Sequence, residues 1–314
     1  MKKSATAQRA QAWVTAWALG IFSLSAIAST EGLAKSEQAP EFRLRAEIVT
    51  LPFVMVREYP FVEGSVEGVR GKWMLDTGLE IALAINDHRV PLDTTSTGDG
   101  QFGSGQKFAI RRAPVVRQVH VGGLDFPQVT TVQTQDATQL ERITPDFLGW
   151  IGFNLWNPST LKMDYRQQKA TFYRSASADA LAGEELVAAL PFGLRKLPHI
   201  PVMAGRVGDL PVAAAFDTGA YGMLCIDQQS MDRLLASGVL KPSGKDGRYD
   251  LSGLRIGATA MPDLKEIFVL TSGFPAAVPT GLTDPAVLVL GYAFLRQFKT
   301  VWDYREQKLY LLRP

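Results

Sequence analysis

The chain has 314 residues and a formal net charge of +2, and 46% of its residues are hydrophobic while 20% are charged. This composition is typical of a globular protein and excludes a disordered one, and the length allows one large domain or two modest ones. Because no basic patch stands out, nucleic acid is not expected as a partner.

The first thirty residues form a separate segment. Two lysines and an arginine precede an uncharged run over 10–30, in which small residues at 26 and 28 fit a signal-peptidase site. We therefore predict a signal peptide over 1–28, an N-terminal tail over 29–45, and an exported protein, periplasmic or secreted. The alternative is an uncleaved membrane anchor, since the run is about long enough to span a bilayer. Contact with a membrane is expected only in that case.

The rest of the chain repeats its landmarks in the same order. The tripeptide LPF begins at Leu51 and Leu190, DTG at Asp76 and Asp217, and DYR at Asp164 and Asp303, while an apolar run ends at Gly152 and Gly291. The copies of LPF, DTG, the glycine and DYR are 139, 141, 139 and 139 residues apart, which indicates a duplication. We interpret the chain as two similar lobes, over 46–175 and 185–314, joined by a small, polar linker over 176–184.

The predicted elements are mostly strands. Stretches rich in β-branched residues and bounded by glycine or proline predict strands within 46–56, 113–123, 127–134 and 265–271. One helix is predicted in the second half, with Asp227 as its N-cap, Leu234 on its apolar face and Gly238 near its end. A short helix is expected after each late glycine, and Pro91 excludes a longer helix after the first DTG. The predicted fold class is mainly β and bilobal, with pseudo-two-fold symmetry.

Each DTG tripeptide follows an apolar strand and places an acid at its end, where a buried charge is costly. One such tripeptide means little, but two copies at matching places in duplicated halves indicate a functional pair. A two-fold axis between the lobes would bring Asp76 and Asp217 together, and two carboxyls in contact share one proton. The ionised member would then activate a water while the protonated member polarises a carbonyl group.

In these features the chain resembles the aspartic peptidases of the pepsin and retroviral-protease superfamily. The resemblance covers most of the chain after the predicted signal peptide and rests on MLDTG, AAFDTG and the downstream stretches GWIG and LVLG. It implies a pepsin-like or retropepsin-like fold of two duplicated, β-barrel-like lobes. It also implies an aspartic endopeptidase that acts as a monomer on a peptide or protein substrate and needs no metal or other cofactor, and the predicted signal peptide makes this enzyme an exported one.

The same resemblance implies roles for particular residues. It assigns Asp76 and Asp217 to the catalytic dyad, and it makes Thr77 and Thr218 a brace between the lobes. The residues that it implies as support for the active site are Thr77, Gly78, Thr218, Gly219, Gly152 and Gly291.

A flap, meaning a β-hairpin that covers the substrate, is expected in the glycine-rich stretch over 96–112. The candidate flap residues are Phe102, Gly103, Ser104 and Gly105. The flaps of pepsin-like enzymes carry a tyrosine, which this stretch lacks, and Leu79 stands where relatives place Ser, Thr or Ala. A non-catalytic peptide-binding protein on the same fold is therefore the alternative function.

The remaining motifs point to no further site. A GxGxxG spacing at 98–103 lacks the preceding strand and following helix of a dinucleotide site. His88, His120 and His199 have no zinc-binding spacing, so we expect each to be a surface or loop residue. Cys225 is the only cysteine, which allows no internal disulfide, and its apolar neighbours predict a buried structural thiol.

Overall fold

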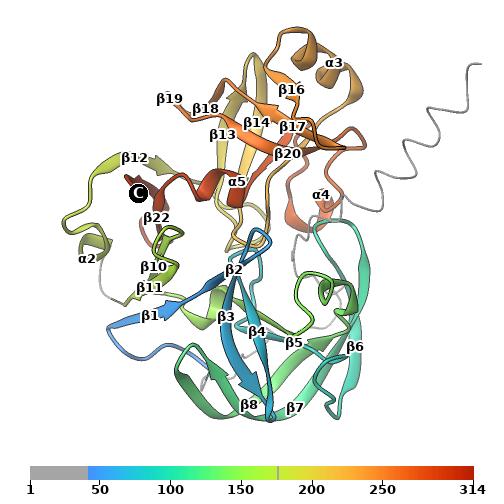
Figure 1. Ribbon diagram of the computed structural model, residues 1–314, viewed down its shortest axis with the longest axis vertical. Helices are drawn as coiled ribbons and strands as arrows, with labels where there is room; N and C mark the ends of the chain where they lie inside the picture. Colours follow the sequence, from blue (N-terminus) through green and yellow to red (C-terminus); the bar gives the residue numbers. More distant parts are fainter. Residues whose placement is uncertain (1–41, 175–176) are drawn as a thin grey trace, which may run out of the picture.

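The structure is a computed structural model that describes residues 42–174 and 177–314 (Figure 1). The predicted signal peptide over 1–28 and most of the predicted tail over 29–45 lie outside these residues. The described chain is mainly β and forms two lobes, one from each half of the sequence, and a third sheet draws strands from both halves. No helix within the described ranges is long and apolar enough to cross a membrane.

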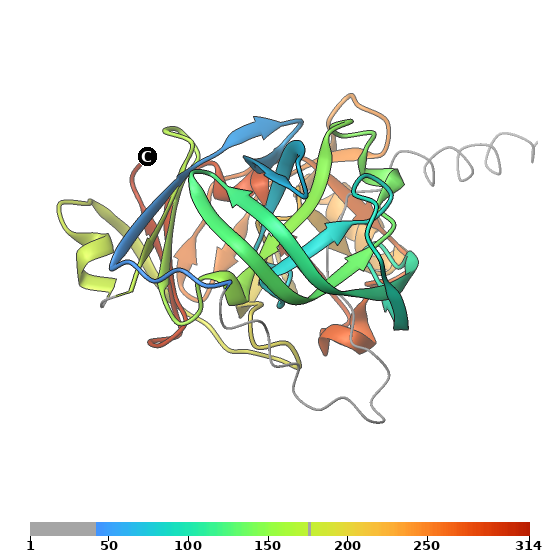
Figure 2. The same cartoon turned by 90° about the horizontal axis from the view of Figure 1, so that it is seen from below.

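The first lobe contains an eight-stranded sheet in the order β2-β3-β4-β9-β5-β8-β7-β6. Strand β3 also pairs with the long strand β7, which curls this sheet over on itself (Figure 2). At its centre β4 runs antiparallel to β3 and parallel to β9. The strands are β2 (Val54–Val56), β3 (Tyr59–Val66), β4 (Val69–Asp76), β5 (Leu83–Asn86), β6 (Thr95–Gln101), β7 (Lys107–Val121), β8 (Leu124–Gln135) and β9 (Phe147–Gly152).

The second lobe contains a nine-stranded sheet in the order β16-β17-β20-β15-β21-β14-β13-β18-β19. Its central pair, β14 and β21, is parallel, as β4 and β9 are in the first lobe. The strands are β13 (Val202–Val207), β14 (Leu210–Phe216), β15 (Met223–Cys225), β16 (Leu240–Pro242), β17 (Arg248–Leu251), β18 (Leu254–Ile256), β19 (Thr259–Ala260), β20 (Leu264–Leu270) and β21 (Val287–Leu290).

The helical elements of the described residues are short, and α3, η2 and α5 lie where the sequence predicts them. Helix α3 (Gln228–Ala236) begins after Asp227, whose carboxylate accepts the Ser230 N–H at 2.6 Å and so caps the helix. A 3-10 turn, η2 (Phe153–Leu155), follows the late glycine of the first half, and α5 (Tyr292–Leu295) follows that of the second. Two further short elements are η1 (Thr138–Leu140) and α4 (Ala277–Thr280).

The third sheet has six strands in the order β1-β11-β10-β22-β23-β12, so three come from each half. The halves meet where β10 pairs antiparallel with β22. The strands are β1 (Ile48–Pro52), β10 (Thr160–Asp164), β11 (Lys169–Tyr173), β12 (Leu186–Pro191), β22 (Lys299–Asp303) and β23 (Lys308–Leu312). This sheet joins the lobes through main-chain hydrogen bonds rather than through side-chain contacts alone.

The segment predicted as a linker over 176–184 contains a short helix, α2 (Ser177–Leu181). Ala180 of this helix is buried in a small apolar cluster with Val301 and Leu312 of the third sheet. Beyond the helix, Glu184 accepts hydrogen bonds of 2.6 Å from both Lys162 and Lys299. This connection is therefore docked onto the sheet that both halves share.

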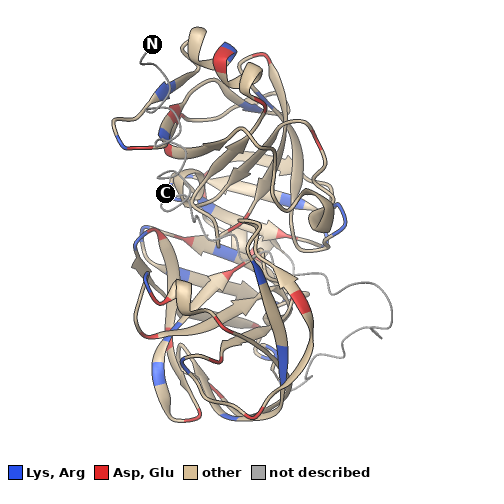
Figure 3. Cartoon of the chain, turned by 90° about the vertical axis from the view of Figure 1, so that its right-hand side faces the viewer, with Lys and Arg blue, Asp and Glu red and all other residues tan. Residues whose placement is uncertain are grey.

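The core runs through both halves and is dominated by large apolar side chains. Its largest fully buried members are Trp73, Trp150, Trp156 and Trp302. Cys225 is buried as predicted, and burial raises the pKa of its thiol to about 12, which makes it unreactive at neutral pH. Acidic and basic residues are mixed over the outside of both lobes (Figure 3), in keeping with the small net charge.

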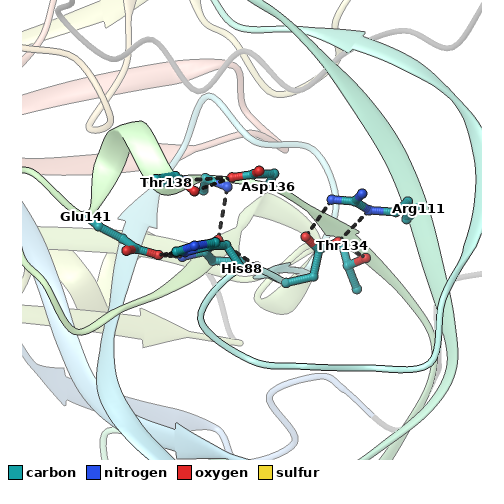
Figure 4. A network of polar contacts seen from close by, with 9 residues as sticks. His88, Arg111, Thr134, Asp136, Thr138 and Glu141 are labelled. Carbon is teal, nitrogen blue, oxygen red and sulfur yellow. Dashed lines mark hydrogen bonds and ion pairs between the residues drawn. The ribbon is translucent and has the colours of Figure 1, made fainter.

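A polar network fixes the loop that follows β5 in the first lobe (Figure 4). Asp87 accepts two hydrogen bonds from the Arg111 guanidinium, at 2.6 and 2.7 Å, and a third from the Thr134 hydroxyl at 2.8 Å. His88 lies at the surface, as expected, and its ring contacts Glu141 at 2.7 Å. This hydrogen bond to Glu141 raises the pKa of His88. The network ties β5, β7 and β8 together at the edge of the lobe.

Candidate active site

Both DTG turns sit at the ends of central strands. Strand β4 ends at Asp76, which is level with Gly152 on the parallel strand β9. In the second lobe β14 ends just before Asp217, whose N–H donates to the Leu290 carbonyl on β21 at 3.2 Å. A Cβ at Gly152 would overlap the carbonyl oxygens of Leu79 and Ile81, just after the first turn, and a Cβ at Gly291 would overlap the Ala220 carbonyl, just after the second. Glycine at both positions therefore lets each turn pack directly on its neighbouring strand.

The two threonines hold the turns together across the lobes. The Thr77 N–H donates to the Thr218 hydroxyl oxygen at 2.9 Å, and the Thr218 N–H donates to the Thr77 hydroxyl oxygen at 3.0 Å. The Thr218 hydroxyl in turn donates to the Leu75 carbonyl at 3.0 Å. Both threonines are fully buried, so these hydrogen bonds are shielded from water and position one turn against the other.

Replacing Thr218 with valine should lower the free energy of unfolding by about 1–3 kcal/mol, because buried partners on both sides lose their hydrogen bonds. The N–H of Thr77 would lose its acceptor and the carbonyl of Leu75 its donor. Thr218→Ser keeps the hydroxyl and should lose clearly less stability. Denaturant-induced unfolding of the two variants and the wild type measures the difference, and equal stability of the two variants would contradict a brace made by the hydroxyl.

The two carboxyl groups, 141 residues apart in the sequence, meet at one backbone N–H. The Gly78 N–H lies 2.8 Å from Asp76 Oδ1 and 3.1 Å from Asp217 Oδ1. Asp217 Oδ1 also accepts the Gly219 N–H at 2.8 Å. Asp76 is fully buried and Asp217 is 2% exposed. The arrangement is thus a pair of enclosed carboxyls that share donors from both turns.

Burial dominates the electrostatics of this pair. It raises the pKa of Asp217, while hydrogen bonds from the Gly219 N–H, the Asp76 side chain and the Gly78 N–H act in the opposite direction. Because the two carboxyls are in contact, their proton affinities belong to the pair. A pair of this kind can hold one proton and one negative charge near neutral pH, which is the state needed for concerted acid and base catalysis.

Glycine is required at the third position of each turn for a steric reason. A Cβ on Gly78 would lie 2.6 Å from Asp217 Oδ2, and a Cβ on Gly219 would overlap the carboxyl of Asp76. Each turn therefore leaves room for the carboxyl of the other one.

The stretch predicted as a flap forms a β-hairpin. Strand β6 pairs antiparallel with β7, with Gly100 opposite Phe108. The turn is closed by the Gly105 N–H, which donates to the Phe102 carbonyl at 2.8 Å. The tip reaches the second lobe, where the Gln101 side chain donates to the Pro275 carbonyl at 3.1 Å. The hairpin thus spans from one lobe to the other.

The aromatic residues of this hairpin are packed inward. The ring of Phe102 lies 4.4 Å from that of Phe108 and 6.1 Å from that of Trp150, measured between centroids. Leu79, immediately after the first DTG turn, is fully buried in the same apolar cluster. Leu79 therefore joins the first turn to the apolar cluster that also contains Phe102 and Phe108.

Sequence reasoning missed His199. We expected a surface or loop residue, and His199 does lie in a loop, in the turn before β13, but it is fully buried there. Its Nε2 lies 2.9 Å from the Gly78 carbonyl, and its own carbonyl accepts the Tyr304 hydroxyl at 2.8 Å. The apolar stretch LPHIPVM around it is a signal of burial that could have identified it. His120 does lie at the surface, beside Asp125.

The two DYR landmarks place tyrosines symmetrically beside the dyad. Tyr165 packs against Phe53 of its own half and Tyr292 of the other, at 5.8 and 5.6 Å. Tyr304 makes the matching contacts, with Phe192 at 5.5 Å and Phe153 at 4.6 Å. Burial, with a smaller contribution from the charge of Asp217, raises the pKa of both phenols, so they stay protonated.

Within residues 42–174 and 177–314, no group of three or more His, Cys, Asp or Glu side chains is arranged to hold a metal ion.

Comparisons with known proteins bear on the fold. No family model and no curated protein matches this sequence. Among solved structures, the chain is similar to an aspartic proteinase from Irpex lacteus, with 13% identity and a TM-score of 0.52 over 85% of this chain and 97% of that one. A likeness at this identity concerns architecture alone. The chain therefore has the mainly β, bilobal fold of the pepsin-like aspartic proteinases, which confirms the predicted fold class.

Proposed function

We propose that this chain is an aspartic endopeptidase that hydrolyses peptide bonds with a water activated by Asp76 and Asp217. The observation that carries the proposal is the single N–H of Gly78, which donates to both carboxyls between turns braced by Thr77 and Thr218. The fold shared with an aspartic proteinase supports it.

In the proposed reaction the ionised member of the pair removes a proton from a water held between the carboxyls. The resulting oxygen nucleophile attacks the peptide carbonyl, while the protonated member transfers its proton to the carbonyl oxygen, so the pair stays singly protonated. The product of this step is a tetrahedral diol, with no covalent bond to the enzyme. In its collapse one hydroxyl of the diol gives its proton to the ionised carboxyl, the C–N bond breaks, and the protonated carboxyl transfers its proton to the leaving amine. The pair is therefore singly protonated again.

The substrate in this proposal is an extended peptide bound between the lobes, beneath the hairpin formed by β6 and β7. Support comes from the reach of the hairpin, whose Gln101 contacts Pro275 of the other lobe. An extended substrate of this kind would be covered by the hairpin, and water would be excluded from the reacting groups. Phe102 and Phe108 pack into the apolar cluster of the first lobe and so hold in place the hairpin that would cover the peptide.

Export is a separate part of the proposal and rests on the predicted signal peptide over 1–28. Expression of the full chain followed by N-terminal sequencing of the mature protein tests it. The expected mature N-terminus is Ser29.

Digestion of a peptide library by the purified protein tests the proposed activity. We expect cleavage of internal peptide bonds that is absent from an Asp217→Asn preparation made in parallel. Pepstatin, a peptide inhibitor that mimics the tetrahedral diol, should block cleavage and raise the melting temperature. Stabilisation by pepstatin without any cleavage between pH 3 and 8 would instead support the non-catalytic peptide-binding protein.

A further inference from the structure

His199 is a fully buried histidine that contacts the candidate active site from the second half of the chain. Its Nε2 lies 2.9 Å from the Gly78 carbonyl. Because a carbonyl oxygen can only accept, Nε2 carries the proton and donates it, and Nδ1 holds a lone pair. Nδ1 is also buried and has no hydrogen-bond partner among the described residues. These contacts fix the ring as a neutral imidazole in one tautomer.

The surroundings hold this ring in place. The ring of Phe153, from η2 of the first half, has its centroid 6.1 Å from that of His199. Tyr304, in the turn after β22, packs on Phe153 and donates its hydroxyl to the His199 carbonyl. His199 is thus held both by its own half and by a residue of the other half.

The hydrogen bond from His199 ends at Gly78, whose N–H donates to both carboxyls of the pair. Gly78 donates its N–H to Asp76 and Asp217, and it has no side chain that would restrict its backbone. A hydrogen bond at the Gly78 carbonyl therefore limits rotation of the adjoining peptide groups. The described part of the first half has no equivalent of this contact. The residue that matches His199 at the 141-residue offset of the DTG turns is Glu58, a partly exposed side chain 3.9 Å from Arg248.

We propose that His199 is a positioning residue of this peptidase: its neutral ring holds the Gly78 backbone so that the shared N–H reaches both carboxyls, and protonation of the ring sets the acid limit of hydrolysis. The inference rests on the proposed function. Protonation at Nδ1 would place a positive charge and a second N–H inside the core, where the described residues offer no acceptor.

The titration of His199 agrees with this geometry. Burial lowers the pKa of His199 to about 4, while the bond to Gly78 acts in the opposite direction. The titratable groups on the elements around it include the phenol of Tyr304, the buried carboxyl of Asp303 that precedes it, Glu80 two residues after Gly78 and, beyond Gly78, the two carboxyls of the pair. Burial raises the pKa of Tyr304 well above its ordinary value, so its phenol stays neutral throughout the acidic and neutral range. Arg195 and Lys196, on the same loop as His199, are exposed to solvent.

Two substitutions at 199 separate the hydrogen bond from the titration. His199→Phe keeps a planar ring but has no donor, and we expect kcat to fall by about tenfold with little change in KM, as for the loss of one hydrogen bond. His199→Gln offers an N–H that does not titrate. It should retain more of kcat than the phenylalanine variant. A plot of kcat against pH falls on its acid side (the acid limb), and for the glutamine variant the midpoint of this fall should lie about one pH unit or more below that of the wild type. His88→Gln, at an exposed histidine, is the matched control and should leave the acid limb in place.

Protein stability gives a readout that does not depend on activity. The folded chain binds a proton at His199 only near pH 4, whereas the ordinary pKa of histidine is 6.5. The unfolded chain therefore takes up the proton first, and the stability that His199 contributes is present above pH 6.5 and is lost as pH falls toward 4. The wild type should lose unfolding free energy over this window, and His199→Gln should lose less.

The outcomes distinguish this inference from the function on which it rests. A wild type that cleaves no peptide contradicts the proposed function, and the stability measurement then still tests the titration of His199. A wild type that cleaves, with a phenylalanine variant of unchanged kcat or a glutamine variant of unchanged acid limb, contradicts only the inference. A variant that loses stability but keeps the wild-type kcat and pH profile would show a purely structural role and would also overturn it.

Discussion

Peptide hydrolysis should fall by about 10³-fold or more when Asp76 or Asp217 is replaced with asparagine, because an amide cannot exchange protons with water or with the leaving amine. Each variant keeps the shape of the side chain, so the braced turns should remain. Initial rates on a peptide that the wild type cleaves measure the effect. Asp209→Asn, at a fully exposed carboxylate, is the matched control and should cleave at the wild-type rate.

The same asparagine variants should not be destabilised at neutral pH. Burial raises the pKa of Asp217, so the folded protein holds a proton that the unfolded chain releases. The stability that this contributes is present below the ordinary pKa of 3.8 and is lost as pH rises through the folded-state value. An asparagine at 217 does not ionise, so Asp217→Asn should not lose unfolding free energy as pH rises through this value. Loss of activity accompanied by unfolding, seen by circular dichroism, would mean that the carboxyl serves the fold rather than the reaction.

Replacing Gly78 with alanine should have the second largest effect. The new methyl group would lie 2.6 Å from Asp217 Oδ2, so the carboxyls must move apart or the turn must shift. Such overpacking costs about 1–3 kcal/mol of stability. A displacement of the reacting groups by about 1 Å can lower kcat by about 100-fold.

The matched control for this substitution is Gly193→Ala, since a Cβ there would meet no atom closer than 3.9 Å. Kinetics and thermal unfolding of the two variants should separate the local clash from any general effect of adding a methyl group. Wild-type kcat in Gly78→Ala would show that hydrolysis does not need the close approach of the two turns.

The repeated sequence motifs predicted the central strands of both lobes, because main-chain pairing determines where these strands lie. Both apolar runs that end in an acid are central strands, and both late glycines lie on the parallel neighbour of such a strand or directly after it. The helix capped by Asp227 was also predictable, because its cap and its apolar face are local signals. The same reasoning predicted that Asp76 and Asp217 lie together, since a two-fold axis between the lobes relates the two turns and a functional pair requires both turns to lie near it.

Contacts made by loops were not predictable in the same way. His199 reaches Gly78 and Gln101 reaches Pro275 only after both lobes are folded, and no periodicity in the sequence carries that information. Leu79 was interpreted as a departure from the Ser, Thr or Ala expected at its position, whereas the structure buries it in one apolar cluster with Phe102. In each case the missing information is the packing of one segment against another that is distant in the sequence.

The antiparallel pairing of β10 with β22, here called the seam, affects whether one half could associate with a copy of itself. Lys162 lies opposite Val301, and these two residues are themselves equivalent under the 139-residue offset, so the pseudo-two-fold axis passes between them. If the N-terminal half were to associate with a copy of itself through this seam, Lys162 would face a second Lys162 with only 14% of the side chain exposed. The C-terminal half would place valine against valine. Divergence at this pair therefore removes the symmetry at the axis itself, and it would disfavour self-association of the N-terminal half alone.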